Sequence, residues 1–439
     1  MFKTLVNSWK SKEIRKKLLW TLLLIVIFRL GSHISVPLLD FGVLNEVMKN
    51  PTGLAGLIDL ITGGAFQRLS IFAMSISPYI SSSIMLQLLA MVIPALERMM
   101  KEGGPEGRKI IGRYTKIITV ILATVQSIGM YLSYAKQGVF QYQGFIPALI
   151  VITSFITGTL FLVYLGEKIT AKGIGNGTSM LIFAGIVSAL PTRTIAIFRG
   201  LVVSGRLDMT QLLIAIVILI MSILMMAGTV FVQEAERRIP VQYAKKVVGR
   251  KIYGGQNTYI PLKLVMAGVM PIIFASSFMT FPAMLIQVFW PASVANGGFA
   301  SFMYSVALAP NIPNISWYYI ILHALTYILL IVGFTFFYTL AIFNPQEVSN
   351  NIKQNGGFIP GIRTGKNTTD YLKNIVSKLT LFGAMFLSLI AILPMFLSFV
   401  GINLAFAGTA ILIVAGVALE TVTNLESQLS VRHYKGFLD

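Results

Sequence analysis

The sequence predicts an all-α polytopic membrane protein with ten transmembrane helices. Three observations support this fold class: the composition, the number of long apolar runs, and the distribution of Lys and Arg between those runs. Of the 439 residues, 55% are hydrophobic and only 12% are charged, with a mean hydropathy of +0.78. A soluble domain of this size does not have such a composition, so most of the chain is expected to lie in a lipid bilayer.

Ten apolar runs are long enough to be membrane spans, for which about 20 residues are needed. They cover residues 18–36, 71–94, 114–135, 145–165, 178–198, 211–232, 263–289, 315–343, 374–398 and 402–420. The basic N-terminal segment followed by the first run could be a secretory signal. No small-residue cleavage site follows it, so the run is interpreted as a retained first span.

The distribution of Lys and Arg tests this count of spans. When a residue within a few positions of a span end is counted with the adjacent loop, the N-terminal segment, the even-numbered loops and the tail hold 28 of the 35 Lys and Arg. The odd-numbered loops hold six, and Arg29 lies inside the first span. By the positive-inside rule, this asymmetry places both termini in the cytoplasm. The net charge of +19 therefore lies mostly on the cytoplasmic face, where anionic lipid or an acidic or nucleic-acid partner could bind.

The stretch 53–94 is apolar but interrupted. A first helical piece, 54–62, is too short to cross a bilayer, Gly63 and Gly64 end it, and Arg68 is costly in lipid. Irregular backbone at membrane depth occurs only where protein or a water-filled cavity surrounds it. The stretch therefore predicts either a re-entrant half-helix beside an aqueous path or an extracellular loop with a surface helix.

Two long cytoplasmic loops, 234–263 and 344–370, combine basic residues with apolar and aromatic ones. The tract 250–253 (RKIY) predicts a hairpin standing out of the membrane, and 355–363 (NGGFIPGIR) predicts a turn-rich segment ending in an arginine. A purely solvated loop would be polar throughout, so docking of a protein partner is favoured.

The residues that carry intramembrane chemistry are nearly absent. There is no Cys, and His33, His323 and His433 lack metal-ligand spacing, so no metal or cofactor is expected. Arg29 is expected to snorkel or line water, and His323 to be a hydrogen-bonded packing residue. The segment 173–179 (GIGNGTS) lacks the lysine of a phosphate-binding loop and predicts a closely packed helix start. These features disfavour an intramembrane enzyme or a solute transporter without excluding the transporter.

Several segments together resemble the SecY family, the channel subunit of the bacterial Sec protein translocase. They are 78–84 (PYISSSI), 173–177 (GIGNG) before 182–186 (IFAGI), 237–244 (RRIPVQYA), 273–277 (IFASS) and 358–363 (FIPGIR). The resemblance covers essentially the whole chain, in order. It implies two pseudo-symmetric inverted halves of five helices around a pore, here residues 1–200 and 201–439. A weak similarity between the second and seventh spans, at Pro78 and Ile80 and at Pro271 and Ile273, agrees with inverted halves, although chance could produce it.

The resemblance also implies site residues. A central constriction corresponds to Ile80, Ile84, Ile182, Ile186, Ile273 and Ile413. A plug helix corresponds to Gly56, Leu57, Ile58, Asp59, Leu60, Ile61, Thr62, Gly63, Gly64, Ala65 and Phe66. A lateral gate corresponds to Gln87, Gln126, Ser276 and Ser277, and partner binding to Arg237, Arg238, Lys245, Lys246, Arg250, Lys251 and Arg363.

The function implied is that of a protein-conducting channel and not of an enzyme. It would move unfolded secretory polypeptides across the bacterial cytoplasmic membrane and release transmembrane segments sideways into lipid. The partners implied are SecE, SecG, the motor ATPase SecA or the ribosome, signal peptides, unfolded preproteins and membrane lipids. A small-solute secondary transporter is the alternative.

Overall fold

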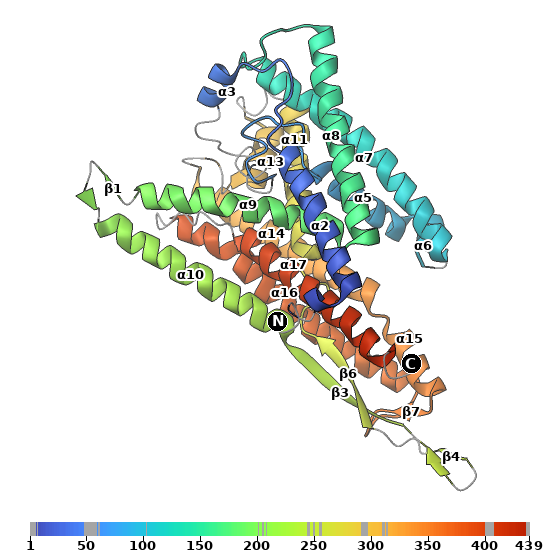
Figure 1. The fold of residues 1–439 in the computed structure, drawn as a ribbon. Helices are drawn as coiled ribbons and strands as arrows, with labels where there is room; N and C mark the ends of the chain where they lie inside the picture. Colours follow the sequence, from blue (N-terminus) through green and yellow to red (C-terminus); the bar gives the residue numbers. More distant parts are fainter. Residues whose placement is uncertain are drawn as a thin grey trace. The chain divides into compact units, whose positions relative to one another are not determined.

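The computed structural model describes residues 6, 8–47, 59, 62–101, 103–200, 202–203, 206–207, 209–243, 246–248, 251–253, 257–290, 297–309, 312, 315–399 and 408–435. The chain packs as two compact units. Figure 1 shows their helices and strands, coloured along the sequence. Unit 1 contains residues 1–215, 276–325 and 417–439, and unit 2 contains residues 216–275 and 326–416.

A helix occupies each of the ten apolar runs. These helices are α2 (Lys12–Gly31), α5 (Ser77–Val92), α7 (Gly104–Ala135), α8 (Phe145–Lys172), α9 (Gly177–Gly200), α10 (Met209–Glu234), α11 (Met270–Phe289), α14 (Trp317–Ile342), α16 (Lys366–Phe399) and α17 (Gly408–Lys435). The shorter helices are α3 (Phe41–Val47), α6 (Pro94–Lys101), α13 (Phe299–Leu308) and α15 (Pro345–Gln354).

Seven of the described helices are long and apolar enough to cross a membrane, and an eighth span results if α5 and α6 are counted together. The chain bends by 111° between those two helices, at Pro94. Helix α2 is not counted among these spans because its first turns and Arg29 are charged. Helix α9 is not counted because its apolar part, Gly177–Thr192, is short. The structure thus supports a helical multi-pass membrane protein.

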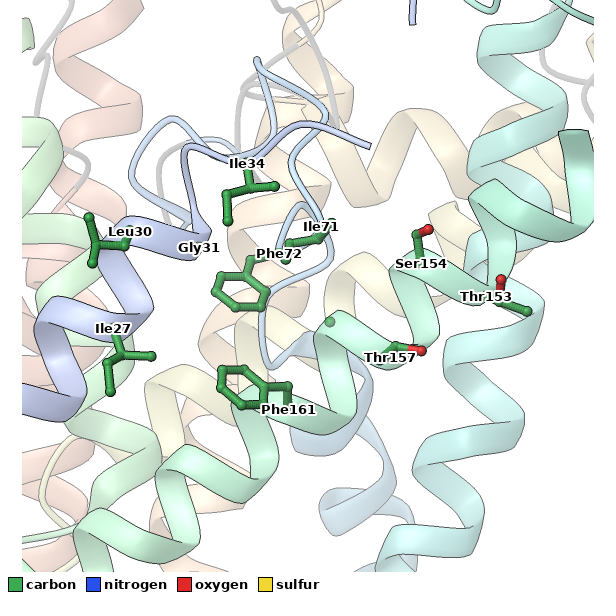
Figure 2. A pocket seen from close by; sticks show the side chains of 11 residues that line it. Ile27, Leu30, Gly31, Ile34, Ile71, Phe72, Thr153, Ser154, Thr157 and Phe161 are labelled. Carbon is green, nitrogen blue, oxygen red and sulfur yellow. The ribbon is translucent and has the colours of Figure 1, made fainter. Parts of the chain in front are cut away.

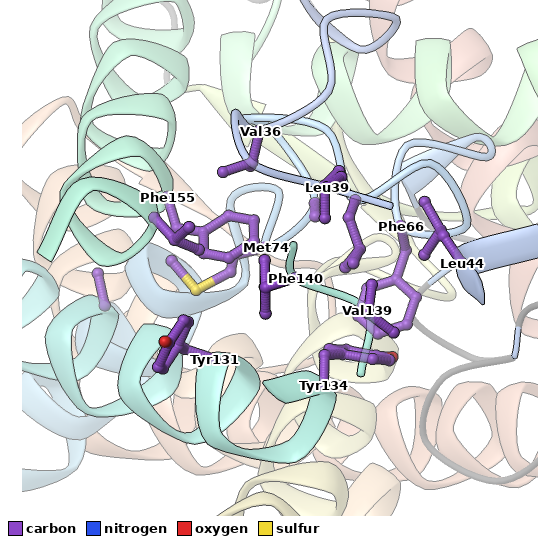
Figure 3. Packing of buried hydrophobic residues seen from close by; sticks show 14 residues of the cluster. Val36, Leu39, Leu44, Phe66, Met74, Tyr131, Tyr134, Val139, Phe140 and Phe155 are labelled. Atoms are coloured by element: carbon purple, nitrogen blue, oxygen red, sulfur yellow. The ribbon is translucent and has the colours of Figure 1, made fainter. Parts of the chain in front are cut away.

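In unit 1, an apolar core covers the segment that leads into α5. Val36 and Leu39 after α2, Phe66 and Leu69 before α5, and Phe155 of α8 belong to this cluster (Figure 3). Backbone bridges pair Ser35 with Ser70 and Leu39 with Phe140. Residues 62–76 therefore form an ordered succession of turns held by packing on neighbouring helices, although the sequence predicts that a span begins at residue 71.

In unit 2, the first of the two long loops predicted to be cytoplasmic folds into strands. β3 (Glu236–Tyr243) pairs antiparallel with β6 (Asn257–Lys263) and with β7 (Gly357–Phe358), while β4 (Lys246–Val248) and β5 (Lys251–Tyr253) form a separate hairpin (Figure 1). The predicted hairpin is confirmed, with Lys251 opposite Val248 and Tyr253 opposite Lys246. A further two-residue pair joins β1 (Val202–Val203) to β2 (Arg206–Leu207).

Candidate functional site

The six isoleucines of the predicted constriction lie on four helices, and all are buried. Ile80 and Ile84 lie on α5, Ile182 and Ile186 on α9, Ile273 on α11 and Ile413 on α17, with exposed fractions between 2% and 8%. The first four belong to unit 1 and the last two to unit 2. Each position therefore presents a branched apolar side chain with no hydrogen-bonding group.

The orientation of α5 is set by a polar contact with α7. The hydroxyls of Ser82 and Thr119 lie 2.6 Å apart, and both residues are fully buried. A helix turns by about 100° per residue, so residues 80 and 84 lie on the side of α5 opposite Ser82. The face that carries Ile80 and Ile84 is therefore directed away from α7.

The position of α9 is set at its first residue. The Asn176 side-chain oxygen accepts from the backbone N–H groups of Thr178 (3.1 Å) and Ser179 (3.5 Å), which caps the helix. A Cβ at Gly177 would lie 1.9 Å from the Gly166 carbonyl oxygen of α8, so only glycine fits there. The predicted closely packed helix start is confirmed, and it fixes where Ile182 and Ile186 lie.

In unit 2, the start of α11 and the third turn of α17 approach closely. A Cβ at Gly416 would lie 2.0 Å from Val269 Cγ1. Val269 precedes Ile273 by one helical turn, and its carbonyl accepts from the Ile273 N–H at 3.3 Å. Ile413 lies one turn before Gly416 on α17, so both isoleucines are close to this contact.

The segment before α5 contains the second half of the predicted plug. Residues 56–58, 60 and 61 lie outside the described residues, while Asp59 and residues 62–66 are described. The Asp59 carboxylate accepts from Gln67 N–H (3.0 Å), and its carbonyl accepts from Gly64 N–H (3.2 Å). The Thr62 hydroxyl accepts from Phe66 N–H at 3.2 Å. Asp59 and residues 62–67 are therefore joined in a turn by hydrogen bonds among themselves.

This turn contacts α9 at Gly63. A Cβ there would lie 2.4 Å from both the Gly185 carbonyl oxygen and Ser188 Oγ. Gly185 directly precedes Ile186 in the chain. The structure therefore brings the predicted plug segment onto the helix that carries two of the predicted constriction residues.

Arg29 also contacts this turn. Its Nη1 donates to the Gly63 carbonyl oxygen at 2.8 Å and lies 3.4 Å from Ser32 Oγ. From the sequence, Arg29 was expected to extend to the membrane surface or to line water. The structure shows instead that its guanidinium donates to the protein backbone at Gly63. His323 behaves as expected, since it is buried with Nδ1 2.8 Å from the Val306 carbonyl oxygen.

The four predicted lateral-gate residues all lie in unit 1. Gln87 Nε2 donates to Ser83 Oγ one turn earlier on α5, at 3.0 Å. Gln126 is buried on α7, and its amide nitrogen has no hydrogen-bond partner among the described residues. Ser276 and Ser277 are half-buried, and their carbonyl oxygens accept from the Thr280 hydroxyl at 3.0 and 3.1 Å.

The predicted partner-binding residues lie around the strands of unit 2. Arg237 and Arg238 are exposed on β3, Lys246 and Lys251 are on the β4–β5 hairpin, and Lys245 and Arg250 lie outside the described residues. Arg238 Nε donates to Glu236 at 2.6 Å, and its guanidinium lies 4.8 Å from the centre of the Tyr259 ring. The Glu236 carboxylate raises the pKa of Arg238.

Arg363 is exposed at the end of a turn whose Ile359 side chain is buried in the core of unit 2. Ile359, four residues earlier, is 2% exposed and packs in a cluster with Ile239 of β3 and Leu372 of α16. The Thr368 hydroxyl donates to the Arg363 carbonyl oxygen at 3.0 Å. Several apolar residues interpreted as docking groups thus pack inside unit 2, whereas Phe358 and Tyr259 remain exposed.

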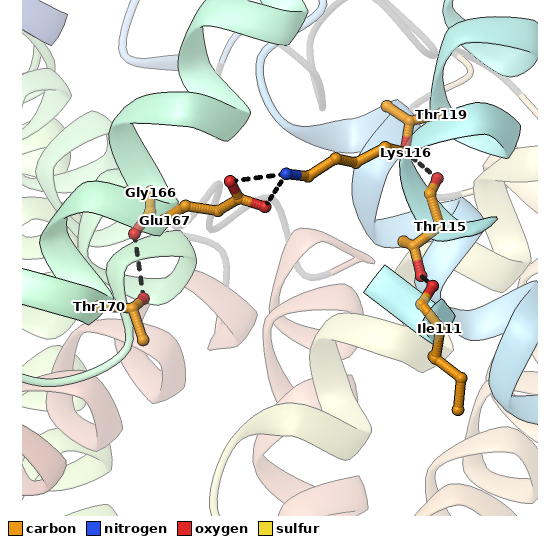
Figure 4. Close-up of polar contacts among 7 residues, drawn as sticks. All are labelled: Ile111, Thr115, Lys116, Thr119, Gly166, Glu167 and Thr170. Atoms are coloured by element: carbon orange, nitrogen blue, oxygen red, sulfur yellow. Dashed lines mark hydrogen bonds and ion pairs between the residues drawn. The ribbon is translucent and has the colours of Figure 1, made fainter. Parts of the chain in front are cut away.

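An ion pair joins α7 to α8 at the ends that the charge distribution places toward the cytoplasm. Lys116 Nζ lies 2.7 and 2.8 Å from the two carboxylate oxygens of Glu167 (Figure 4). Both side chains are more than 40% exposed, so the pair contributes little to stability. The pair marks where these two helix ends lie side by side.

Unit 1 also contains an apolar cavity of about 610 Å³ between α2, α8 and residues 71–72. Figure 2 shows Ile27, Ile71, Phe72 and Phe161 along its wall. The hydroxyls of Thr153 and Ser154 in the wall donate to carbonyl oxygens of their own helix at 2.7 Å. A solute site requires a few convergent polar groups, so this cavity does not favour the transporter alternative.

Comparison with known proteins identifies the family. The family model described as SecY matches residues 70–422. The protein translocase subunit SecY of Streptomyces scabiei is 40% identical over 455 residues, covering 100% of both chains. A solved structure described as a protein-conducting channel superposes with a TM-score of 0.67 at 19% identity, covering 94% of this chain and 92% of that one. Sec61 in a canine ribosome-channel complex gives 0.63 at 17% identity, with the same coverage. The chain belongs to the SecY family.

Proposed function

We propose that this chain lines the path by which unfolded secretory polypeptides cross the cytoplasmic membrane of a bacterium, and that it releases transmembrane segments sideways into lipid. Membership of the SecY family makes it a protein-conducting channel subunit of a Sec translocase and not an enzyme. The constriction, plug, lateral gate and partners described next are the finer parts of this proposal.

The constriction consists of Ile80, Ile84, Ile182, Ile186, Ile273 and Ile413. A conduit for polypeptides of any sequence must not hold one side chain tightly, and branched apolar groups offer no hydrogen-bond preference. A ring of such groups closes around a passing chain and excludes ions by dewetting. The burial of all six side chains and the absence of a polar group at these positions support this role.

The plug is the segment 56–66, which closes the constriction from the outer side. The observation that carries the proposal is the contact of Gly63 with Gly185 and Ser188, next to Ile186. Because a Cβ would collide there, Gly63 lies directly against the helix that supplies part of the proposed ring, which supports this role. An unrelated outer loop has no reason to approach α9 so closely.

The ten helices form two inverted halves, residues 1–200 and 201–439. Ten helices at the ten apolar runs and the strong asymmetry of Lys and Arg support this arrangement, with both termini cytoplasmic. Gln87 and Gln126 on one side, and Ser276 and Ser277 on the other, line the lateral gate. The amide nitrogen of Gln126 is buried without a hydrogen-bond partner among the described residues, which suits a wall that must open toward lipid.

SecE and SecG assemble with this chain, and SecA or a translating ribosome docks on the loops 234–263 and 344–370. A fold relative, Sec61, is seen in a ribosome-channel complex. The exposed Arg237, Arg238 and Arg363 in unit 2, with the lysines of the β4–β5 hairpin, suit acidic protein surfaces or ribosomal RNA. These partners supply the energy, and signal peptides with unfolded preproteins are the cargo.

Reconstitution tests the proposal. The chain is purified with SecE and SecG, placed in liposomes, and supplied with SecA, ATP and a secretory preprotein. We expect protease protection of the preprotein that depends on ATP and on an intact signal sequence. The matched control is the same preprotein with charged residues in the signal sequence. Equal protection of both preproteins, or protection of neither, contradicts the proposal.

A further inference from the structure

Arg29 is the only basic residue in an otherwise apolar stretch that runs from Leu18 to the end of α2. An arginine near the end of such a helix ordinarily extends to the water interface. Here the half-buried guanidinium instead donates to the Gly63 carbonyl oxygen at 2.8 Å. Its own backbone carbonyl accepts from the Ser32 hydroxyl at 2.7 Å, which stabilises the helix end that carries it.

Gly63 is therefore held from two sides. Arg29 of α2 binds its carbonyl oxygen, and Gly185 with Ser188 of α9 closes the side where a Cβ would stand. Within the turn, the Asp59 carboxylate accepts from Gln67 N–H and the Asp59 carbonyl oxygen accepts from Gly64 N–H. The bond from Arg29 instead reaches the backbone of the turn from a neighbouring helix, so it ties the turn to α2.

A second arginine, Arg68, serves as a control for the loss of charge. Arg68 is exposed just beyond the turn. Loss of the Arg29 side chain removes the hydrogen bond to the Gly63 carbonyl oxygen, whereas loss of the Arg68 side chain leaves that bond in place. Each substitution removes one positive charge near the turn, so the two arginines form a matched pair for an experiment.

We infer that Arg29 is a positioning residue that holds the plug segment in its resting place by the hydrogen bond to Gly63. This inference rests on the proposed function of residues 56–66 as the plug. The bond to Gly63 must break when the segment leaves α9, so Arg29 sets how often the resting channel opens. It does not touch the constriction isoleucines in this role, and its effect is on the closed state.

A single thiol can report the position of the segment, because the chain has no cysteine. Ser188→Cys replaces a half-buried side chain directly beneath Gly63 with one of nearly the same shape. The purified complex with SecE and SecG is placed in liposomes with the outer face accessible. The rate of labelling by a membrane-impermeant maleimide and the resting ion conductance are then measured.

With Arg29→Met we expect labelling at least about tenfold faster and a higher resting conductance, since a charge-assisted hydrogen bond is lost. Arg29→Lys retains a donor and should label more slowly than Arg29→Met, which also separates a lost bond from a misfolded chain. Arg68→Met should label no faster than the parent. The inference is overturned if Arg29→Met labels at the parental rate, or if Arg68→Met labels as fast as Arg29→Met.

Deletion of residues 57–65 in the same Ser188→Cys protein separates this inference from the proposed function. Fast labelling and leakage after the deletion, with parental behaviour of Arg29→Met, overturn the role of Arg29 alone. Slow labelling and a tight channel after the deletion overturn the plug itself.

Discussion

At the scale of single residues, Gly63 is restricted both by its backbone conformation and by its neighbours. Its φ of +67° lies in the left-handed region, and a Cβ would collide with α9. Gly64 has a similar φ of +86° but nothing within 4 Å of a Cβ. A substitution at Gly64 therefore adds backbone strain alone, whereas the same substitution at Gly63 adds both the strain and a collision with α9.

Gly63→Ala is expected to make resting channels leak ions, while Gly64→Ala is the matched control. Both substitutions add the left-handed strain of about 1–2 kcal/mol, but only the first pushes the segment away from Gly185 and Ser188. Conductance across planar bilayers containing the purified complex measures the difference. A leak of the same size from both variants would show that strain, and not contact with α9, is responsible.

Arg363→Glu is expected to abolish SecA-driven secretion while the protein stays folded in the membrane. The side chain is exposed, and the Thr368 hydroxyl binds the Arg363 backbone carbonyl, which the substitution leaves in place. Lys366→Glu gives the same change of charge three residues later, at the start of α16, where an acidic residue is tolerated. Preprotein translocation and the membrane level of each variant are measured. Normal secretion by Arg363→Glu would refute the prediction.

At the scale of elements, several starts and turns could be predicted from the residues because the deciding interactions are local. Asn176 caps α9 within three residues, and the β4–β5 hairpin follows from alternation over a few positions. By contrast, α13 was not predicted. It follows Gly297 and Gly298, which favour a loop, and it is held by a tertiary contact, since Ala307 and Leu308 are buried with Ala283 of α11. The bend at Pro94 likewise divides what the sequence predicts as one span.

Helix α5 offers a test of the constriction by comparing adjacent positions. Ile84 is 4% exposed and Met85 is 42% exposed. Ile84→Asn should destabilise the closed state by about 1–3 kcal/mol because it buries an amide, and it should increase secretion of preproteins with defective signal sequences. Ile413→Asn should act in the same direction from α17. Met85→Asn is the control for the added polarity. If Ile84→Asn leaves conductance and signal stringency unchanged, the ring assignment is wrong.

At the scale of the whole molecule, membrane character and the positions of ten helices follow from hydropathy, because lipid requires long apolar runs. Hydropathy alone does not reveal how the isoleucines of the proposed constriction are placed. Ile182 and Ile186 cannot be told from other helix residues by sequence, and their position depends on the Gly177 contact with α8 that fixes α9. The role of Arg29 was not predicted because its partner is a backbone carbonyl 34 residues away, which leaves no pattern in the sequence.

Deletion of residues 57–65 is the corresponding test of the complete channel. We expect the purified complex to conduct ions at rest while still translocating preproteins, because the isoleucines remain. Conductance and ATP-dependent translocation are measured on the same preparation. A resting channel as tight as the parent would contradict the assignment of a plug.

The anchoring of the Arg363 turn has a mechanical consequence. Ile359 is buried against α16, and Ser349 of α15 donates to the Gly365 carbonyl oxygen at 3.1 Å. Helix α16 then runs for 34 residues, or roughly 50 Å at 1.5 Å per residue. A force applied at Arg363 by the proposed motor partner therefore acts on a continuous helix rather than on a flexible loop, and that helix carries a proline only near its end, at Pro394.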